Sequence, residues 1–416
     1  MQASIVEDSR FQLNDYLADE LARTYGTPLY VIDERSFRDR ARRFVVNFPG
    51  DVSFASKANT SLGVIKMAHQ EGCSIDVASE GEFRGALKAE VPPGDCRLHG
   101  NNKSAAELEF AVEKKIGKII VDCFEEIEKL SKFEWTPPLL LRLAPGVDPH
   151  THAKISTGQA DTKFGFPIKD ALRAIELCLN SRLPLIGFHC HVGSQLMDAT
   201  SQSTAAKVLA QIAHKAQAEL GFETKFLNIG GGLGVRYTAA DNPISIEEFC
   251  HRVATTAREA IGPSASLGLE PGRSMVAEAG CTLYEVGVVK TAASGRKFVA
   301  VDGGLSDNPR PALYGARYEL VWHGHSNEPS SIVTVSGKHC ETDTLFAEVD
   351  APSTVRAGDL VQVLCTGAYN ASMANNYNGL RRPATVLVQE NGGHLEIQRR
   401  ETWDELHARD INLEAV

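Results

Sequence analysis

Residues 226–234 read FLNIGGGLG, an apolar run followed at once by Gly230, Gly231 and Gly232, with Gly234 two positions on. The apolar residues predict a buried strand. The glycines predict a turn whose backbone N–H groups can surround an anion, because glycine allows close approach and positive φ. A tight turn without a ligand explains them equally well. The spacing matches neither a P-loop nor GxGxxG, so the segment does not indicate a nucleotide site.

The same alternation of strand and helix patterns extends outward from about residue 27 to residue 283. Strands are predicted by PLYVID, VSFAS, CSIDVAS, KIIVDC, LLLRLAP, LIGFHCHV, FLNIGGG and LGLEPG. Helical spacing of apolar residues occurs between them in AAELEFAVEKK, FEEIEKLSKF and KDALRAIELCLN. About eight such units predict an α/β fold, a closed (β/α)8 TIM barrel.

After about residue 284 the pattern changes to short strands rich in β-branched residues. They are YEVGVVKTA, KFVAVDGG, SIVTVSG, DTLFAEV, DLVQVLC, ATVLVQE and HLEIQRR, separated mainly by Gly, Asp or Asn. This pattern predicts a C-terminal antiparallel β domain. The 416 residues suit a large barrel plus a smaller domain.

Composition excludes several classes of protein. A net charge of -10, with scattered Lys and Arg, disfavours binding to nucleic acid or to an anionic membrane. Nine cysteines without a C-x-x-C pair argue against a disulfide framework and a structural zinc site, and favour a reducing compartment. No apolar run approaches the roughly 18 residues that span a bilayer, and the N-terminus lacks a signal pattern. We therefore expect a cytoplasmic protein.

Barrel enzymes place their chemistry at the carboxyl ends of the strands. Lys57 follows VSFAS and can form a Schiff base if its amine is neutralised, although a lone lysine at a strand end is more often a solvated surface residue. Glu270 opens EPGR and can keep a pyridine nitrogen protonated, or can be an exposed acid. Arg273 can clamp an anion or form a surface ion pair.

His189 and His191 alternate on one predicted strand, with Ser194 just beyond. A metal pair is conceivable, but no third ligand follows at a suggestive spacing, so we expect no metal. One histidine can be a core residue and the other can stack on an aromatic cofactor.

Three segments of the β domain are irregular for simple strands. VDGGLSDNPRPALYGARY contains Arg310 and Tyr314, SGKHCETDTL contains Cys340 beside Glu341, and CTGAYNASMANNYN contains Tyr369. A thiol with an ordinary pKa of about 8.5 is mostly protonated at neutral pH, so Cys340 can donate a proton. The alternative for Cys340 is a small buried apolar residue, and ANNYN can be a simple turn.

Ordered motifs link these segments to a known family. SKAN, DVASEGE, GNNKS, TKFGF, HCHVGSQ, GGGLG, EPGR, DNPRPALY, CETD, GAY and NYN occur in this order, between GTPLYVID near residue 26 and RRETWDEL near residue 406. In them the chain resembles the diaminopimelate decarboxylase branch of the pyridoxal-phosphate decarboxylases, which have an alanine-racemase-like barrel of fold type III. The resemblance implies pyridoxal 5′-phosphate as cofactor and decarboxylation of meso-2,6-diaminopimelate to L-lysine and CO2.

The resemblance also implies residue roles. Lys57 matches the Schiff-base lysine, His191 the residue stacked on the ring, and Cys340 the proton donor. The implied cofactor-binding residues are Lys57, His191, Ser194, Gly231, Gly232, Glu270, Gly272, Arg273 and Tyr369. The implied substrate-binding residues are Arg273, Arg310, Tyr314, Glu341 and Tyr369.

The family is a homodimer in which CETD reaches the partner's active site, so the resemblance implies two shared sites. It implies a barrel over residues 33–280 and a β domain formed by residues 1–32 and 281–416. Ser56 and Thr385 depart from the family's usual residues, at positions without a catalytic group.

Other functions remain open from the sequence. Glu341 together with Arg310 and Arg273 favours a substrate with a distal carboxylate over lysine or ornithine. A sister decarboxylase of a carrier-tethered or antibiotic-pathway amino acid shares most of these motifs. An inactive regulatory subunit is the alternative of another class, and the presence of both Lys57 and Cys340 argues against it.

Overall fold

The computed structural model describes residues 10–147, 162–325, 328–342 and 344–411. They divide into two compact units. The barrel unit contains the described residues of Arg38–Val235 and Asn242–Met275. The β unit contains the described residues up to Phe37, Arg236–Asp241 and the described residues from Val276 onward. Residues 1–9, in which the sequence shows no signal pattern, and Asp343 of CETD lie outside the described residues.

Eight parallel strands form the barrel unit. They are β2 (Asp51–Ala55), β3 (Ser74–Val77), β4 (Cys96–Leu98), β5 (Lys118–Val121), β6 (Leu139–Ala144), β8 (Leu185–His189), β9 (Phe226–Asn228) and β10 (Ser266–Leu269). Their order is β5-β4-β3-β2-β10-β9-β8-β6, and pairing between β5 and β6 closes the barrel. The two-residue β7 (Phe166–Pro167) is added beside β6. The predicted (β/α)8 barrel is confirmed.

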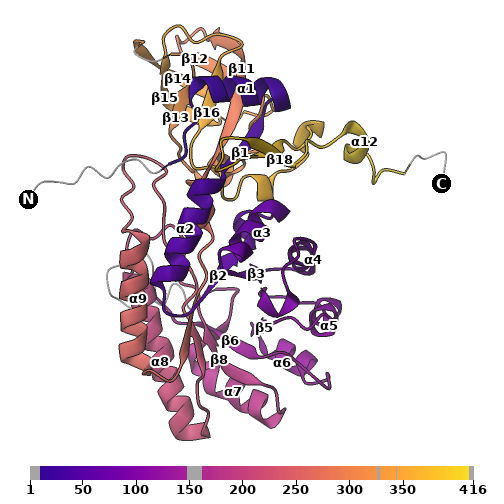
Figure 1. The fold of residues 1–416 in the computed structure, drawn as a ribbon, viewed down its shortest axis with the longest axis vertical. Coiled ribbons are helices and arrows are strands. Elements are labelled where there is room, and N and C mark those ends of the chain that lie inside the picture. The colour runs from indigo at the N-terminus through magenta and orange to yellow at the C-terminus, as the bar shows by residue number, and fades with distance from the viewer. Residues whose placement is uncertain (1–9, 148–161, 326–327, 343, 412–416) are drawn as a thin grey trace, which may run out of the picture. The chain divides into compact units, whose positions relative to one another are not determined.

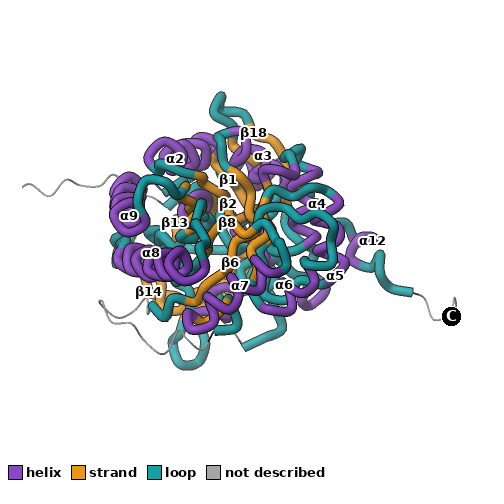
Figure 2. Tube along the Cα trace, turned by 90° about the horizontal axis from the view of Figure 1, so that it is seen from below, coloured by secondary structure: helices purple, strands orange, loops and turns teal. Residues whose placement is uncertain are grey.

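Helices cover the outside of the strands, as the end-on view in Figure 2 shows. They are α2 (Glu34–Asn47), α3 (Leu62–Gln70), α4 (Glu80–Lys88), α5 (Ala105–Glu113), α6 (Phe124–Leu130), α7 (Ala171–Asn180), α8 (Thr200–Leu220), α9 (Ile246–Ile261) and the short α10 (Arg273–Val276). Ser79 and Ser245 cap α4 and α9, and Ser104 and Glu107 form a capping box on α5. Over the ranges described, every helix is too short or too polar to cross a membrane.

The sequence misassigned one barrel strand and missed another. PLYVID, predicted among the barrel strands, is β1 (Leu29–Asp33), and it pairs with β11 and β17 of the β unit. The missing barrel strand is β4, which has three residues and a charged centre. Its central Arg97 is buried and pairs with Asp51. A strand this short, with a buried ion pair, leaves no hydrophobic pattern to detect.

The β unit contains a nine-stranded sheet, drawn in Figure 1. With β1 it comprises β11 (Gly280–Thr291), β12 (Lys297–Val301), β13 (Leu320–Trp322), β14 (Ser330–Ser336), β15 (Phe346–Pro352), β16 (Leu360–Val363), β17 (Ala384–Val388) and β18 (His394–Gln398). All seven predicted C-terminal strands are present, and β13 is additional. Most neighbours are antiparallel, as expected.

Two pairings in this sheet are parallel, between β1 and β17 and between β12 and β14. They join strands that are not consecutive in the chain, so no short hairpin turn fixes an antiparallel direction. The sheet is therefore mixed. Apolar residues of β1, β11 and β17 pack with Leu21 of α1 (Asp15–Tyr25) in one core cluster. The β unit also contains the short helices α11 (Arg310–Tyr314) and α12 (Trp403–Leu406).

A buried ion pair fixes the GNNKS segment of the barrel unit. Lys103 Nζ lies 2.9 Å from Glu126 Oε2, and both side chains are at most 2% exposed. The same ammonium donates to the carbonyls of Gly100 and Ile120 at 2.7 Å. The lysine therefore connects the loop after β4 to β5 and α6.

Lys103→Met should lower the free energy of unfolding by about 3–5 kcal/mol, because the Glu126 carboxylate would remain buried without its counter-ion. The matched control is Lys215→Met, which removes an exposed pair with Glu219 at 3.8 Å and should cost less than about 1 kcal/mol. Urea unfolding followed by circular dichroism measures both. Equal losses of unfolding free energy in the two variants would contradict a stabilising role for the buried Lys103–Glu126 pair.

Candidate active site

The carboxyl ends of the barrel strands bring together the residues predicted to carry the chemistry. Lys57 lies in the 3-10 turn η1 (Ser56–Ala58) directly after β2, and His191 lies two residues after β8. The glycine run follows β9 closely, and Glu270 follows β10 at once. Since all these strands are parallel, the four segments meet at one rim of the barrel.

The turn that presents Lys57 is fixed by the residue before it. Ser56 is fully buried, and its single hydroxyl proton is shared between the Asp76 carbonyl at 2.7 Å and Glu82 Oε2 at 3.0 Å. Lys57 itself is exposed. The departure of Ser56 from the family's apolar residue therefore has a structural role, because its hydroxyl satisfies a buried carbonyl and an acid.

The glycine loop requires glycine for two reasons. Gly230 and Gly232 have φ of 71° and 131°, which side chains adopt at a cost. A Cβ on Gly231 would lie 2.1 Å from the Glu270 carbonyl oxygen, and one on Gly272 would lie 3.0 Å from Ala55 Cβ. The backbone at this rim is therefore packed too closely for any side chain.

His191 is held against this loop. Its Nδ1 accepts a hydrogen bond from the Gly231 N–H at 3.4 Å. Burial of the ring, together with the positive charges of Lys57 and Arg142, lowers the pKa of His191 to about 3. The imidazole is therefore neutral at neutral pH and presents an uncharged aromatic face.

Arg273 and Ser194 lie beside each other, with Arg273 Nε donating to Ser194 Oγ at 3.1 Å. The rim thus offers a guanidinium and a hydroxyl beside a closely packed glycine backbone. This donor set suits a phosphate group, which takes charge-assisted hydrogen bonds and close backbone contacts.

The Glu270 carboxylate is the centre of a buried polar cluster. Its Oε2 accepts from His189 Nε2 at 2.9 Å, and its Oε1 accepts from Asn228 Nδ2 at 2.6 Å. His99 Nε2 lies 3.3 Å from Oε1 and 3.6 Å from Asp76 Oδ1. Glu270 is only 8% exposed, so its charge depends on these neighbours rather than on water.

Three groups in this cluster carry charge: the carboxylates of Glu270 and Asp76 and the imidazolium of His99. Burial favours the neutral acid of Glu270, but His189 and His99 outweigh burial and hold its pKa well below the usual range. Burial likewise opposes a charge on His99, but the Glu270 and Asp76 carboxylates raise its pKa to about 9. Burial lowers the pKa of His189 to about 4, so this ring is a neutral hydrogen-bond donor. Glu270 is therefore an ionised, oriented acceptor.

The sequence did not identify the full cluster. His99, Asp76 and Asn228 were not selected, although Asp76 and Asn228 lie on β3 and β9 and His99 directly follows β4. Reading every predicted strand end for polar residues would have found Asp76 and Asn228, but not His99, because β4 was not predicted. His99, His189 and Glu270 also offer atoms within 4.8 Å of one another, as a metal site would. His191, which the sequence made conceivable as a metal partner of His189, is not in this group.

In the β unit, Arg310 is buried among tyrosines. Its Nη1 donates to the hydroxyls of Tyr237 at 3.0 Å and Tyr318 at 2.5 Å. The guanidinium carbon lies 6.0 Å from the ring centre of Tyr369. The structure thus brings Arg310 and Tyr369 together, whereas Tyr314, at the end of α11, is 67% exposed.

The Cys340–Glu341 pair lies on an exposed loop held by the NNYN segment. The backbone N–H of Cys340 donates to Asn378 Oδ1 at 2.9 Å, and the Tyr377 hydroxyl donates to Glu341 Oε1. NNYN is therefore a turn that also orients the CETD segment.

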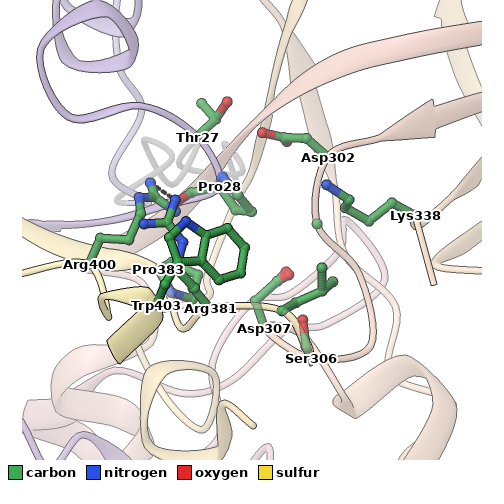
Figure 3. A pocket seen from close by; sticks show the side chains of 12 residues that line it. Thr27, Pro28, Asp302, Ser306, Asp307, Lys338, Arg381, Pro383, Arg400 and Trp403 are labelled. Carbon is green, nitrogen blue, oxygen red and sulfur yellow. Dashed lines mark hydrogen bonds between the residues drawn. The ribbon is translucent and has the colours of Figure 1, made fainter. Parts of the chain in front are cut away.

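A cavity of about 180 Å3 in the β unit lies beside these loops (Figure 3). Asp302, Ser306, Asp307 and Lys338 are among the residues that line it. Beside it, His339 Nε2 accepts from the Ser306 N–H at 3.1 Å. Burial raises the pKa of Asp307 to about 7, and its carboxylate accepts from the Gly304 N–H. These contacts connect the loop before Arg310 to the loop that carries Cys340.

Known proteins match this arrangement. A family model described as the pyridoxal binding domain of pyridoxal-dependent decarboxylases matches residues 34–277. A diaminopimelate decarboxylase of Bacillus methanolicus is 42% identical, with 92% of each chain covered. That of Bacillus subtilis is also 42% identical, over 94% of this chain and 93% of the relative.

A solved structure, diaminopimelate decarboxylase from M. jannaschii in complex with L-lysine, has a TM-score of 0.90. It is 32% identical over 98% of this chain and 97% of that chain. The chain belongs to the pyridoxal-dependent decarboxylases, and within them to the diaminopimelate decarboxylase family. The family resemblance of the motifs and the predicted fold class are confirmed.

Gly231→Ala should destabilise the protein by about 1–3 kcal/mol, because the new methyl group would overlap the Glu270 carbonyl and must displace the backbone. The control is Gly94→Ala, where a Cβ meets nothing within 4 Å and stability should hardly change. Thermal unfolding of both variants compares them. A Gly231→Ala protein as stable as the control would show that the rim is not closely packed.

Proposed function

We propose that this chain converts meso-2,6-diaminopimelate to L-lysine and CO2 with pyridoxal 5′-phosphate as its cofactor. One observation carries the proposal: a lysine, a neutral histidine, a glycine loop and an ionised buried glutamate share one rim of the barrel. The names of the close relatives support the choice of substrate. When bound, the cofactor supplies an electron sink for the pair left by the departing carboxylate.

In this proposal the barrel unit holds the cofactor. Lys57, exposed at the rim, is the covalent attachment point, and Glu270 holds a proton at the ring nitrogen. The neutral His191 packs on the ring face. The phosphate group is bound by Ser194, Gly231, Gly232, Gly272 and Arg273, and the family resemblance assigns Tyr369 to the cofactor as well.

Cys340 is assigned to return a proton to the reacting carbon. All nine cysteines are described and free, and Cys340 is the exposed one. Burial raises the pKa of Cys73 and of Cys178 to about 12, and both thiols are enclosed in the barrel unit. Accessibility therefore favours Cys340 for contact with a substrate.

The substrate's distal end carries an ammonium and a carboxylate. We assign Glu341 to the ammonium and Arg310, aided by Arg273, Tyr314 and Tyr369, to the carboxylate. Two tyrosine hydroxyls fix the guanidinium of Arg310 through Nη1 alone, so its other N–H groups can form a bidentate pair.

We further propose a cytoplasmic homodimer in which Cys340 and Glu341 act in the partner's barrel. The family resemblance of CETD supports this arrangement, and so does the exposure of the loop that carries both residues.

Mixing inactive Lys57→Ala and Cys340→Ala dimers should restore part of the activity. If the sites are shared, each mixed dimer has one site that contains both native residues, Lys57 from one chain and Cys340 from the other. The measurement is CO2 release after subunit exchange, which differently tagged subunits can verify. Verified exchange without recovered activity would argue for sites built within one chain.

Arg310→Ala should cost roughly 2–5 kcal/mol of transition-state binding for meso-diaminopimelate, because the distal carboxylate would lose its partner. Cofactor absorbance should remain. The control is Arg317→Ala, an exposed arginine of the same segment, which should keep its activity. A wild-type enzyme that decarboxylates lysine or ornithine faster than meso-diaminopimelate would refute the proposed substrate.

A further inference from the structure

The cluster around Glu270 contains more charged groups than one acceptor for a ring nitrogen requires. We propose that Asp76 and His99 are a positioning pair that sets the net charge of this cluster at minus one, which offsets one protonated pyridine ring. The inference rests on the proposed role of Glu270. Neither Asp76 nor His99 is assigned to contact the cofactor; both act through Glu270.

The geometry places His99 between the two carboxylates. Its Nε2 is 3.3 Å from Glu270 Oε1 and 3.6 Å from Asp76 Oδ1. Asp76 is 6% exposed, and both of its carboxylate oxygens are buried without a hydrogen-bond partner among the described residues. A buried carboxylate is costly without an opposite charge close by, and His99 supplies one at 3.6 Å.

Other charges that face the cluster lie close to acids outside it. Arg97 of β4 pairs with Asp51, and Lys118 of β5 lies 3.7 Å from the same acid. Arg142 of β6 lies 3.7 Å from Asp122.

The two remaining titratable rings are neutral. Burial lowers the pKa of His189 to about 4 and that of His191 to about 3. Within the cluster, the carboxylates of Glu270 and Asp76 and the imidazolium of His99 therefore sum to a net charge of minus one.

An empty site would bury this charge, and a proton can neutralise it. Burial and the neighbouring Glu270 raise the pKa of Asp76 to about 6, so Asp76 takes up a proton as pH falls through that value. A protonated ring placed at Glu270 would supply the missing positive charge and lower the pKa of Asp76. Cofactor binding below pH 6 should therefore release a proton from Asp76, and affinity should fall with pH there.

Charge variants separate this role from a structural one. Asp76→Asn leaves Glu270 and His99 with no net charge, so the affinity of the apoenzyme for pyridoxal phosphate should fall about tenfold to a hundredfold. The double variant Asp76→Asn/His99→Gln restores a net charge of minus one on Glu270 alone. It should bind more tightly than Asp76→Asn. Residues with only a structural role would give the opposite order, because their losses would add.

Absorbance titrations with pyridoxal phosphate, run on both sides of pH 6, measure these affinities. Proton uptake by groups other than Asp76 is common to wild type and Asp76→Asn, so the difference between the two isolates the Asp76 proton. Infrared difference spectra of the wild type near pH 6 give a second readout, the loss of a protonated carboxyl band on binding. Retention of that band, or a double variant weaker than Asp76→Asn, would overturn the inference.

Glu270→Gln distinguishes failure of the pair from failure of the proposed function. If this variant binds as tightly as the wild type and keeps the same absorbance, the proposed role of Glu270 is wrong. If it weakens binding while Asp76→Asn does not, the role of Glu270 stands and that of the pair fails.

Discussion

The site depends on one constraint, a glutamate that stays ionised while buried at the end of β10. Burial alone would favour the neutral acid, but His189 and His99 hold the pKa of Glu270 well below its usual range. Each neighbour comes from a different strand end, His99 from β4, His189 from β8 and Asn228 from β9. A closed barrel is what allows several strand ends to surround one carboxylate, so the fold and the charge state are linked.

The close packing of the strand ends also explains the residues required at the other positions of the rim. Glycines are required because the loop after β9 packs against the Glu270 backbone, and the Gly231 N–H in turn holds the ring of His191. Ser56 shows how far this packing extends. Its hydroxyl bonds to the Asp76 carbonyl, so the turn presenting Lys57 is fixed by the strand that supplies the cluster's second carboxylate. Lys57, His191 and Glu270, which we propose as attachment point, ring contact and counter-charge, are thus positioned together.

Strong local patterns made the barrel, the seven C-terminal strands and the rim residues Lys57, His191 and Glu270 predictable. Other features depend on contacts that sequence periodicity does not record. β4 could not be predicted because its buried Arg97–Asp51 pair interrupts the hydrophobic pattern. β1 was assigned to the barrel because its true partners, β11 and β17, lie far away in the chain. His99 was missed because a lone histidine beside a glycine has no spacing that indicates Glu270 as its neighbour.

The central claim is that an ionised Glu270 keeps the cofactor's ring nitrogen protonated, which gives the chain its decarboxylase chemistry. The 15N chemical shift of isotope-labelled pyridoxal phosphate bound to the enzyme reports that protonation directly. The account predicts a protonated nitrogen at neutral pH in the wild type and a shift toward the neutral form in Glu270→Gln. A neutral ring nitrogen in the wild-type enzyme at the same pH would contradict it.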